Sequence, residues 1–257
     1  MHLRYREALM LPYFDEEEML KPSAIISERN NMPSTVIMMW SFSLFNTLKD
    51  SLKCTTLSTF KAGVRCPVYG FKYKGTEMAC VLLPIGAPVA VGFIEEYFVR
   101  GVKNFVCIGT CGSLSPQTKG KLVVPTYAYR DEGTSWHYAP HDEPWIKVKT
   151  SLQLSAILDS LGVPYVCGRV WTNDAFYRET PSAVALMKEQ ECLAVEMECA
   201  ANMAVAQYRG ANCYQMLFPA DLLEGSYWNS GSLGKRSRSV NDKLAKIALD
   251  VASLVQL

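Results

Sequence analysis

The chain has 257 residues, of which 49% are hydrophobic, and a formal net charge of +1 at pH 7. This length and this apolar content fit one large domain over residues 1–257. The near-zero net charge does not indicate binding to nucleic acid or to a membrane surface. No apolar run in the sequence is long enough to span a bilayer.

Cysteine and histidine usage limits the chemistry. The nine cysteines are odd in number and lie mostly in apolar segments, which is typical of reduced thiols in a cytoplasmic protein. There are three histidines and no CxxC or HExxH spacing, so we expect no metal. The segment Met1–Glu7 has no apolar signal-peptide core, which also favours a cytoplasmic location.

Extended and helical patterns alternate along most of the chain. The first half predicts a strand at 35–40, a helix at 44–52, a hairpin at 67–83 that turns at Lys74-Gly75, a helix at 89–100, a strand at 105–108 and a loop of small residues at 109–113. The second half predicts a strand at 122–129, a polar loop at 130–144, a helix at 151–161, a strand at 165–171, a helix at 181–190, a strand at 193–197, a helix at 198–208, a strand at 212–218 and a closing amphipathic helix at 240–255. Strands separated by helices indicate parallel βαβ units in a helix–sheet–helix sandwich. Open α/β sheets bind ligands where the strands end, so the loop at 109–113 is the first candidate site.

Several short segments combine small, acidic and aromatic residues. They are Ile85–Pro88 with Glu95-Glu96 downstream, Ile108–Ser113, Arg130–Tyr138, Thr172–Tyr177 and Ala194–Ala200. In their order and spacing, residues 60–255 resemble the nucleoside phosphorylases of the purine and uridine type, a family that includes related nucleosidases. The resemblance implies a single phosphorylase-like domain, which is a three-layer α/β/α sandwich with a mixed central sheet. It also implies cleavage of the N-glycosidic bond of a nucleoside, which we expect to be a purine nucleoside used in salvage.

Such a site must hold the ribose while positive charge develops on it. The resemblance assigns this role to Glu198, because a carboxylate can accept hydrogen bonds from both vicinal hydroxyls. Met197 would lie against the sugar or base as an apolar wall. Gly86 and His137 are further expected substrate contacts, although His137 fits a surface loop equally well. The alternative for Glu198 is a solvated acid at a helix start, where the dipole favours it.

The departing base needs a stacking surface and a proton. Phe176 occupies the stacking position of the family, although an ordinary core aromatic is the alternative. Asp221 is similar to the aspartate that protonates N7 in purine-cleaving members, and partial burial would let it act as a general acid. Its alternative role is to cap the loop after a strand. Arg236 best matches the arginine that assists this acid, with Arg238 as its rival.

The phosphate site departs from the family pattern. Family phosphorylases carry Gly-Asp-Pro-x-Arg after the first strand, but Trp40–Phe45 contains neither glycine nor arginine. A second family arginine is replaced by Cys107, and a thiol cannot substitute for a guanidinium fork. The candidate ligands that remain are Thr110 and the Gly109 amide, Ser41 and Ser43 at a helix start, and Arg65, which the resemblance places at a neighbouring subunit's site.

Three functions stay open at this point. The first is phosphorolysis, with ribosyl transfer to phosphate as the co-substrate and no other cofactor. The second is hydrolysis by water that a carboxylate such as Glu196 or one of Glu16–Glu18 activates. The third is binding of a nucleoside without catalysis, which Asp221 argues against because a binder has little need of a proton donor. The resemblance also implies a homo-oligomer, either a dimer or a hexamer, with no nucleic-acid or membrane partner.

Overall fold

The computed structural model describes residues 11, 13–26, 32–140, 142–223 and 227–255, so Met1–Glu7 lies outside the described residues. The strands are β1 (Thr35–Met39), β2 (Thr55–Ala62), β3 (Val64–Tyr73), β4 (Thr76–Leu82), β5 (Asn104–Ser113), β6 (Leu122–Asp131), β7 (Trp145–Lys147), β8 (Tyr165–Asn173), β9 (Cys192–Glu196) and β10 (Asn212–Leu222). The helices are α2 (Pro22–Ile25), α3 (Phe42–Asp50), α4 (Ala87–Val99), α5 (Ser151–Ser160), α6 (Pro181–Glu189), α7 (Cys199–Arg209) and α8 (Arg238–Leu254). Three 3-10 turns are η1 (Pro116–Thr118), η2 (Thr134–His137) and η3 (Phe176–Arg178). Within these ranges no helix is both long and apolar enough to cross a membrane.

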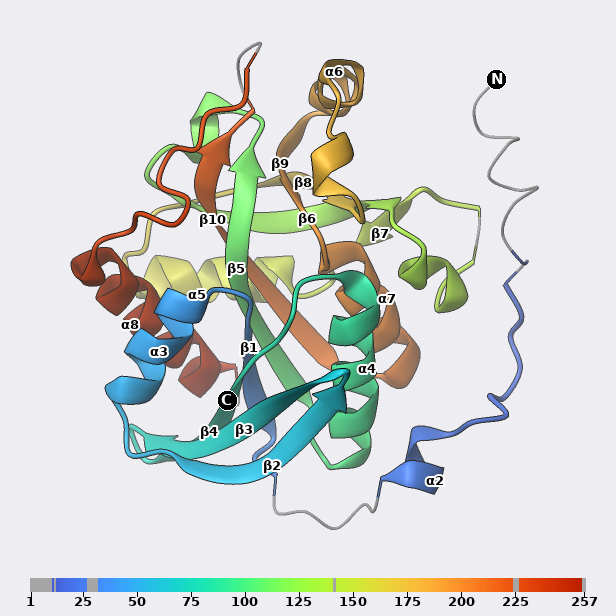
Figure 1. Cartoon of the computed structure of the whole chain (residues 1–257), viewed down its shortest axis with the longest axis vertical. Coiled ribbons are helices and arrows are strands. Elements are labelled where there is room, and N and C mark those ends of the chain that lie inside the picture. Colours follow the sequence, from blue (N-terminus) through green and yellow to red (C-terminus); the bar gives the residue numbers. More distant parts are fainter. Residues whose placement is uncertain (1–10, 12, 27–31, 141, 224–226, 256–257) are drawn as a thin grey trace.

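The strands join in one mixed sheet with helices on both faces (Figure 1). Side chains of β1 alternate between two cores, as the two-residue period of a strand requires. Val36 and Met38 pack in the core that includes α4 and α7, while Ile37 and Met39 pack in the core that includes α3, α5 and α8. This arrangement confirms the predicted three-layer α/β/α sandwich.

The predicted βαβ unit and hairpin are both present. β1 pairs in parallel with β4 on one side and β5 on the other, and α4 connects β4 to β5. The hairpin of β3 and β4 turns at Lys74 and Gly75, whose φ values of 48° and 86° lie in the left-handed region that glycine adopts without strain. The edge strand β2 was not predicted.

The segment 109–113 is not a loop but the second half of β5. Gly109 pairs with Leu217 of β10, and Gly112 pairs with Val195 of β9 on its other side. A Cβ at Gly112 would lie 2.5 Å from Leu223 Cδ1, so the small residues let neighbouring chains approach closely. With this extension β10, β6, β8, β9 and β5 close a ring, because β10 pairs with both β6 and β5.

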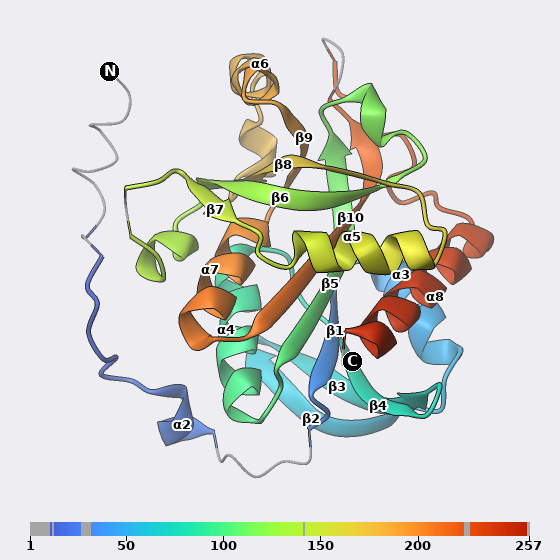
Figure 2. The same cartoon turned by 180° about the vertical axis from the view of Figure 1, so that it is seen from behind.

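Helices α4 and α7 lie side by side against one face of the sheet (Figures 1 and 2). Small buried residues on these helices, among them Ala90, Ala201 and Ala204, allow the close approach. At the far end of the pair, Arg209 donates to both carboxylate oxygens of the buried Glu95, at 2.6 and 3.0 Å. The first turns of both helices therefore lie together at the ends of the parallel strands.

Candidate active site

Glu198 joins the first turns of the two packed helices. It is the N-cap residue of α7 and is 7% exposed, and its Oε1 accepts a hydrogen bond of 2.6 Å from the Gly86 amide at the start of α4. Gly86 has a φ of 113°, a conformation that favours glycine. Burial raises the pKa of Glu198 above its ordinary value, and the charge of nearby Glu196 adds to this shift. The Gly86 amide thus fixes one oxygen of the Glu198 carboxyl group and leaves the other oxygen for a further hydrogen bond.

Glu196 has a structural task. Its Oε1 accepts 2.5 Å from the Thr172 hydroxyl, and its Oε2 accepts 2.8 Å and 2.7 Å from the amides of Glu198 and Cys199. These amides belong to the start of α7 and have no partner within the helix. Because the carboxylate is committed to capping α7, the hypothesis that Glu196 activates water does not fit the structure.

Asp221 lies across β5 from the strand that leads to Glu198. Gly112 of β5 pairs with Asp221 on one side and Val195 on the other. Two strand spacings place the backbones of Asp221 and Val195 about 10 Å apart. The half-buried Asp221 accepts 2.7 Å from Trp228 Nε1 through its Oδ2. Asp221 on β10 and Glu198, which lies two residues past the end of β9, are therefore on opposite sides of the β5 segment that contains Gly112.

Glu179 is a site residue that sequence reasoning missed. It lies just after η3, is half-buried and bonds to Asn173. Burial, and then the charge of Asp221, raise the pKa of Glu179 to about 7. η3 also carries Phe176, which is 43% exposed and whose ring lies 4.2 Å from that of Tyr177, with the two ring planes tilted by 44°. The signal in the sequence was the position of this acidic residue, three residues after Phe176, the expected stacking residue.

Arg236 lies beside Ser41 and the ring of Phe218. Its Nη2 donates 2.8 Å to Ser41 Oγ, its Nε donates 3.2 Å to Asn241, and its guanidinium lies 4.4 Å over the Phe218 ring. The preceding segment folds back along β10, where the Ser232 amide donates to the carbonyl of residue 220 at 2.7 Å. This path carries Arg236 past the end of β10 and towards α3.

The remaining predicted residues divide into two groups. Thr110, half-buried on β5, and the buried Gly109 lie at the strand ends, as does the half-buried Met197 between β9 and α7. Arg65 is exposed on β3, and His137 is exposed in η2. The structure therefore gathers the first group near Glu198 and does not bring Arg65 or His137 to it.

The loop of residues 130–144, predicted to be functional, is held by a buried arginine. Arg130 is 1% exposed and lies 3.7 Å over the Trp136 ring. Its guanidinium donates to Ser135 Oγ and to backbone carbonyls of residues 135, 139, 140 and 143 at 2.7–3.0 Å. Tyr138 packs at 5.6 Å against Tyr208 in the last turn of α7. Ten residues of helix, about 15 Å, separate Tyr208 from Glu198, so this part of the loop lies away from the strand ends.

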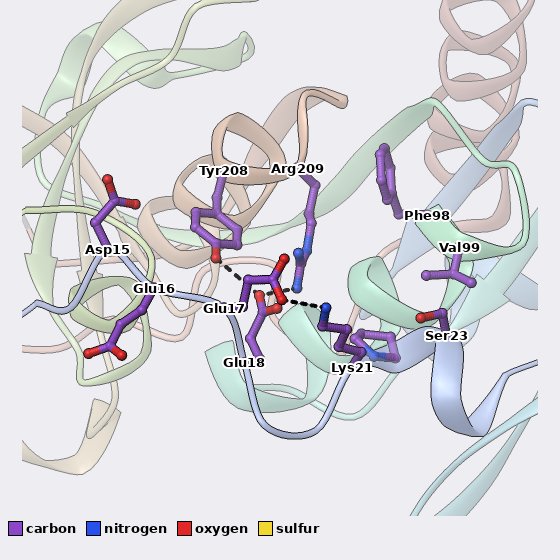
Figure 3. Close-up of a pocket in the computed structure, with 11 residues that line it drawn as sticks. Asp15, Glu16, Glu17, Glu18, Lys21, Ser23, Phe98, Val99, Tyr208 and Arg209 are labelled. Carbon is purple, nitrogen blue, oxygen red and sulfur yellow. Dashed lines mark hydrogen bonds and ion pairs between the residues drawn. The ribbon is translucent and has the colours of Figure 1, made fainter.

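A cavity of about 520 Å³ lies at the same distant end of α4 and α7 (Figure 3). The segment of residues 15–23 lines it together with Phe98, Val99, Tyr208 and Arg209. Glu18 accepts 2.6 Å from Arg209 and 3.1 Å from the Tyr208 hydroxyl. The run Glu16–Glu18 is therefore placed one helix length from Glu198, and the hypothesis that it activates water at the sugar does not fit.

The fold and the residues described above define an α/β protein that carries Glu198, Asp221 and Glu179 near the ends of its strands. A family model described as the phosphorylase superfamily matches residues 43–253. A guanosine phosphorylase of Halorubrum lacusprofundi is 33% identical over 140 residues, or 54% of this chain and 58% of that protein. A DeoD-type purine nucleoside phosphorylase of Caldanaerobacter subterraneus subsp. tengcongensis is 30% identical over 195 residues, or 72% of this chain and 81% of that protein.

The crystal structure of a uridine phosphorylase from Vibrio fischeri ES114 has the same fold, with a TM-score of 0.75 over 93% of this chain and 99% of that one. The two sequences are 23% identical, so this likeness concerns the fold. Because the family model covers most of the chain, the chain belongs to the phosphorylase superfamily. The family predicted from the short motifs is confirmed.

Proposed function

We propose that this protein cleaves the N-glycosidic bond of a purine nucleoside and transfers the ribosyl group to phosphate. The observation that carries the proposal is the buried Glu198 carboxylate, fixed by the Gly86 amide at the strand ends. Fixed carboxylate oxygens accept strong hydrogen bonds from vicinal hydroxyls. Relatives named guanosine phosphorylase and purine nucleoside phosphorylase support a purine substrate.

In the proposed reaction, the bond between C1′ of the ribose and the base nitrogen breaks, and its electron pair goes to the base. Asp221 donates a proton to N7 of the base, which neutralises the leaving group. The neighbouring Glu179, with a pKa of about 7, keeps a proton close to Asp221 at neutral pH. A phosphate oxygen then forms the new bond to C1′, while Glu198 holds the ribose in place and Phe176 stacks on the base.

Hydrolysis is a second candidate for one specific reason. The segment Trp40–Phe45, which follows β1, holds no arginine that could bind phosphate. Water would then replace phosphate at C1′. Among the carboxylates considered for activating water, Glu196 caps α7 and Glu18 accepts from Arg209.

Incubation of the protein with inosine, guanosine, adenosine and uridine, each with and without phosphate, tests the proposal. We expect release of purine bases only when phosphate is present, together with ribose 1-phosphate. Equal release without phosphate would establish hydrolysis instead, and no release from any nucleoside would reject both enzymatic functions.

We also infer a homo-oligomer in which Arg65 serves a neighbouring subunit. Arg65 is exposed at the end of the β2–β3 hairpin, where its backbone lies opposite Lys61 in the strand register, away from the other candidate site residues of its own chain. Light scattering after size exclusion should give a dimer or hexamer, and a monomer with full activity would contradict the inference.

A further inference from the structure

Ser41 at the start of α3, Thr110 of β5 and Phe218 of β10 lie in one row across the sheet. By continuation of the parallel register of Met39 with Ile108, Ser41 lies level with Thr110. Thr110 pairs in turn with Phe218 of β10. Val106 and Ile108 of β5 face the core of α3 and α8, so the alternation of the strand turns Thr110 to this same side. Ser41, Thr110 and Phe218 thus share the face on which Arg236 lies.

Ser41 begins α3 and brings a second hydroxyl with it. Its Oγ accepts from the Leu44 amide at 3.5 Å and lies 3.5 Å from Ser43 Oγ. α3 runs over nine residues, and the amides of its first turn have no partner within the helix. The N-terminal end of such a helix favours an anion.

One buried donor beside Ser41 is unsatisfied by the described residues. Arg236 uses Nε and Nη2, but its Nη1 is buried and has no partner among them. Trp40 does not contribute to this place, because its side chain packs with the core of α4 and α7 on the opposite face of the sheet.

Arg236 also lacks a counter-charge. The ion pairs found among the described residues do not include it. Its guanidinium is half-buried over an aromatic ring, and burial lowers its pKa. An unsatisfied buried donor in a native structure calls for a bound ion or water, and a buried cation calls for an anion.

We propose that Arg236, together with Ser41, Ser43 and Thr110, binds the phosphate that accepts the ribosyl group. Arg236 reaches this place from a segment 195 residues away in the sequence. It supplies the guanidinium that the segment Trp40–Phe45 lacks. This inference rests on the proposed function, and it assigns the acceptor of the reaction to phosphate and not to water.

The test measures orthophosphate binding directly by titration calorimetry at constant ionic strength. We expect Arg236→Gln to weaken phosphate binding about 10- to 100-fold, the effect of losing one charge-assisted contact. Arg236→Lys should fall between wild type and Arg236→Gln, because it keeps the charge and loses the fork. Arg238→Gln is the matched control, since this exposed residue two positions away loses the same charge and should bind phosphate as wild type does.

Kinetics separate this inference from the proposed function. Arg236→Gln should raise KM for phosphate and leave KM for the nucleoside unchanged. Unchanged phosphate affinity in both Arg236 variants, or equal losses in Arg238→Gln, would overturn the assignment of Arg236 while nucleoside cleavage stands. Wild-type protein that binds no phosphate would also overturn the assignment of Arg236. The assay of base release from nucleosides would then test the proposed function separately.

Discussion

Replacing Glu198 by glutamine tests the sugar contact most directly. The amide oxygen can still accept from the Gly86 amide, but the second oxygen becomes an NH₂ group that cannot accept from a ribose hydroxyl. Hydrogen bonds to a charged group contribute about 1.5–3 kcal/mol each, against about 0.5–1.5 kcal/mol for neutral ones. Losing one bond and weakening the other removes about 2–4 kcal/mol, so kcat/KM should fall about 30- to 1000-fold.

The thermal stability of this variant should not fall, because glutamine removes a buried charge that lies near Glu196. Glu196→Gln is the matched control two residues away. In either orientation, its NH₂ group replaces an oxygen that accepts from Thr172 or from the amides of Glu198 and Cys199, leaving a donor unsatisfied at a cost of about 1–3 kcal/mol. In a protein of this size each kcal/mol lowers Tm by about 2–4 °C.

The assay compares base release from a purine nucleoside and its 2′-deoxy analogue. If Glu198 holds the 2′-hydroxyl, wild type should discriminate strongly between the two and Glu198→Gln should discriminate weakly. A Glu198→Gln variant that retains kcat/KM within threefold of wild type, or that keeps full discrimination, would refute the assignment.

Three further outcomes follow from the site and the core. Asp221→Asn should lower kcat for purine nucleosides about 10²- to 10⁴-fold, measured by base release, and a change below threefold would remove the proton donor. Because the folded-state pKa of Glu179 is raised from 4.5 to about 7, its contribution to stability is full below pH 4.5 and is lost as the pH rises through 7. Glu179→Gln should therefore be more stable than wild type at pH 8 by about 1–2 kcal/mol, and as stable as wild type at pH 4.5. The difference at pH 8 is smaller than the pKa shift alone implies, because solvent screens the exposed part of the side chain. Thermal melts at both pH values check this, and a constant difference would contradict it. Arg130→Met should lower the free energy of unfolding by more than about 3 kcal/mol in urea titrations, because it leaves several buried carbonyls unsatisfied; a loss below 1 kcal/mol would show that other groups hold the loop.

The sequence predicted the layers well because buried strands and amphipathic helices carry their period in the chain itself. β1 and β4, for example, are nearly continuous apolar runs. Two errors have physical causes. β2 is an edge strand with mostly exposed threonine, serine and lysine, so no apolar alternation marks it. The second half of β5 reads as a loop because Gly109 and Gly112 make room for neighbouring chains, a need that only the folded sheet reveals.

The site was predictable where a motif contains it and not where the fold assembles it. Glu198 and Asp221 stand in short segments that resemble family motifs, and that resemblance is the source of the roles predicted for them. The contact of Arg236 with Ser41 joins positions 195 residues apart, and the proximity of Glu179 to Asp221 joins a turn to a strand end. Neither association leaves a local pattern.

Helices α4 and α7 are linked at both ends, by Gly86 with Glu198 and by Glu95 with Arg209. A displacement of one helix at either link therefore moves the other helix too. Enlarging Ala201, which is fully buried in the core that these helices share, would push them apart and shift Glu198 relative to the Gly86 amide. Substitutions meant to change the proposed substrate preference should therefore leave this helix pair intact and change only residues at the strand ends.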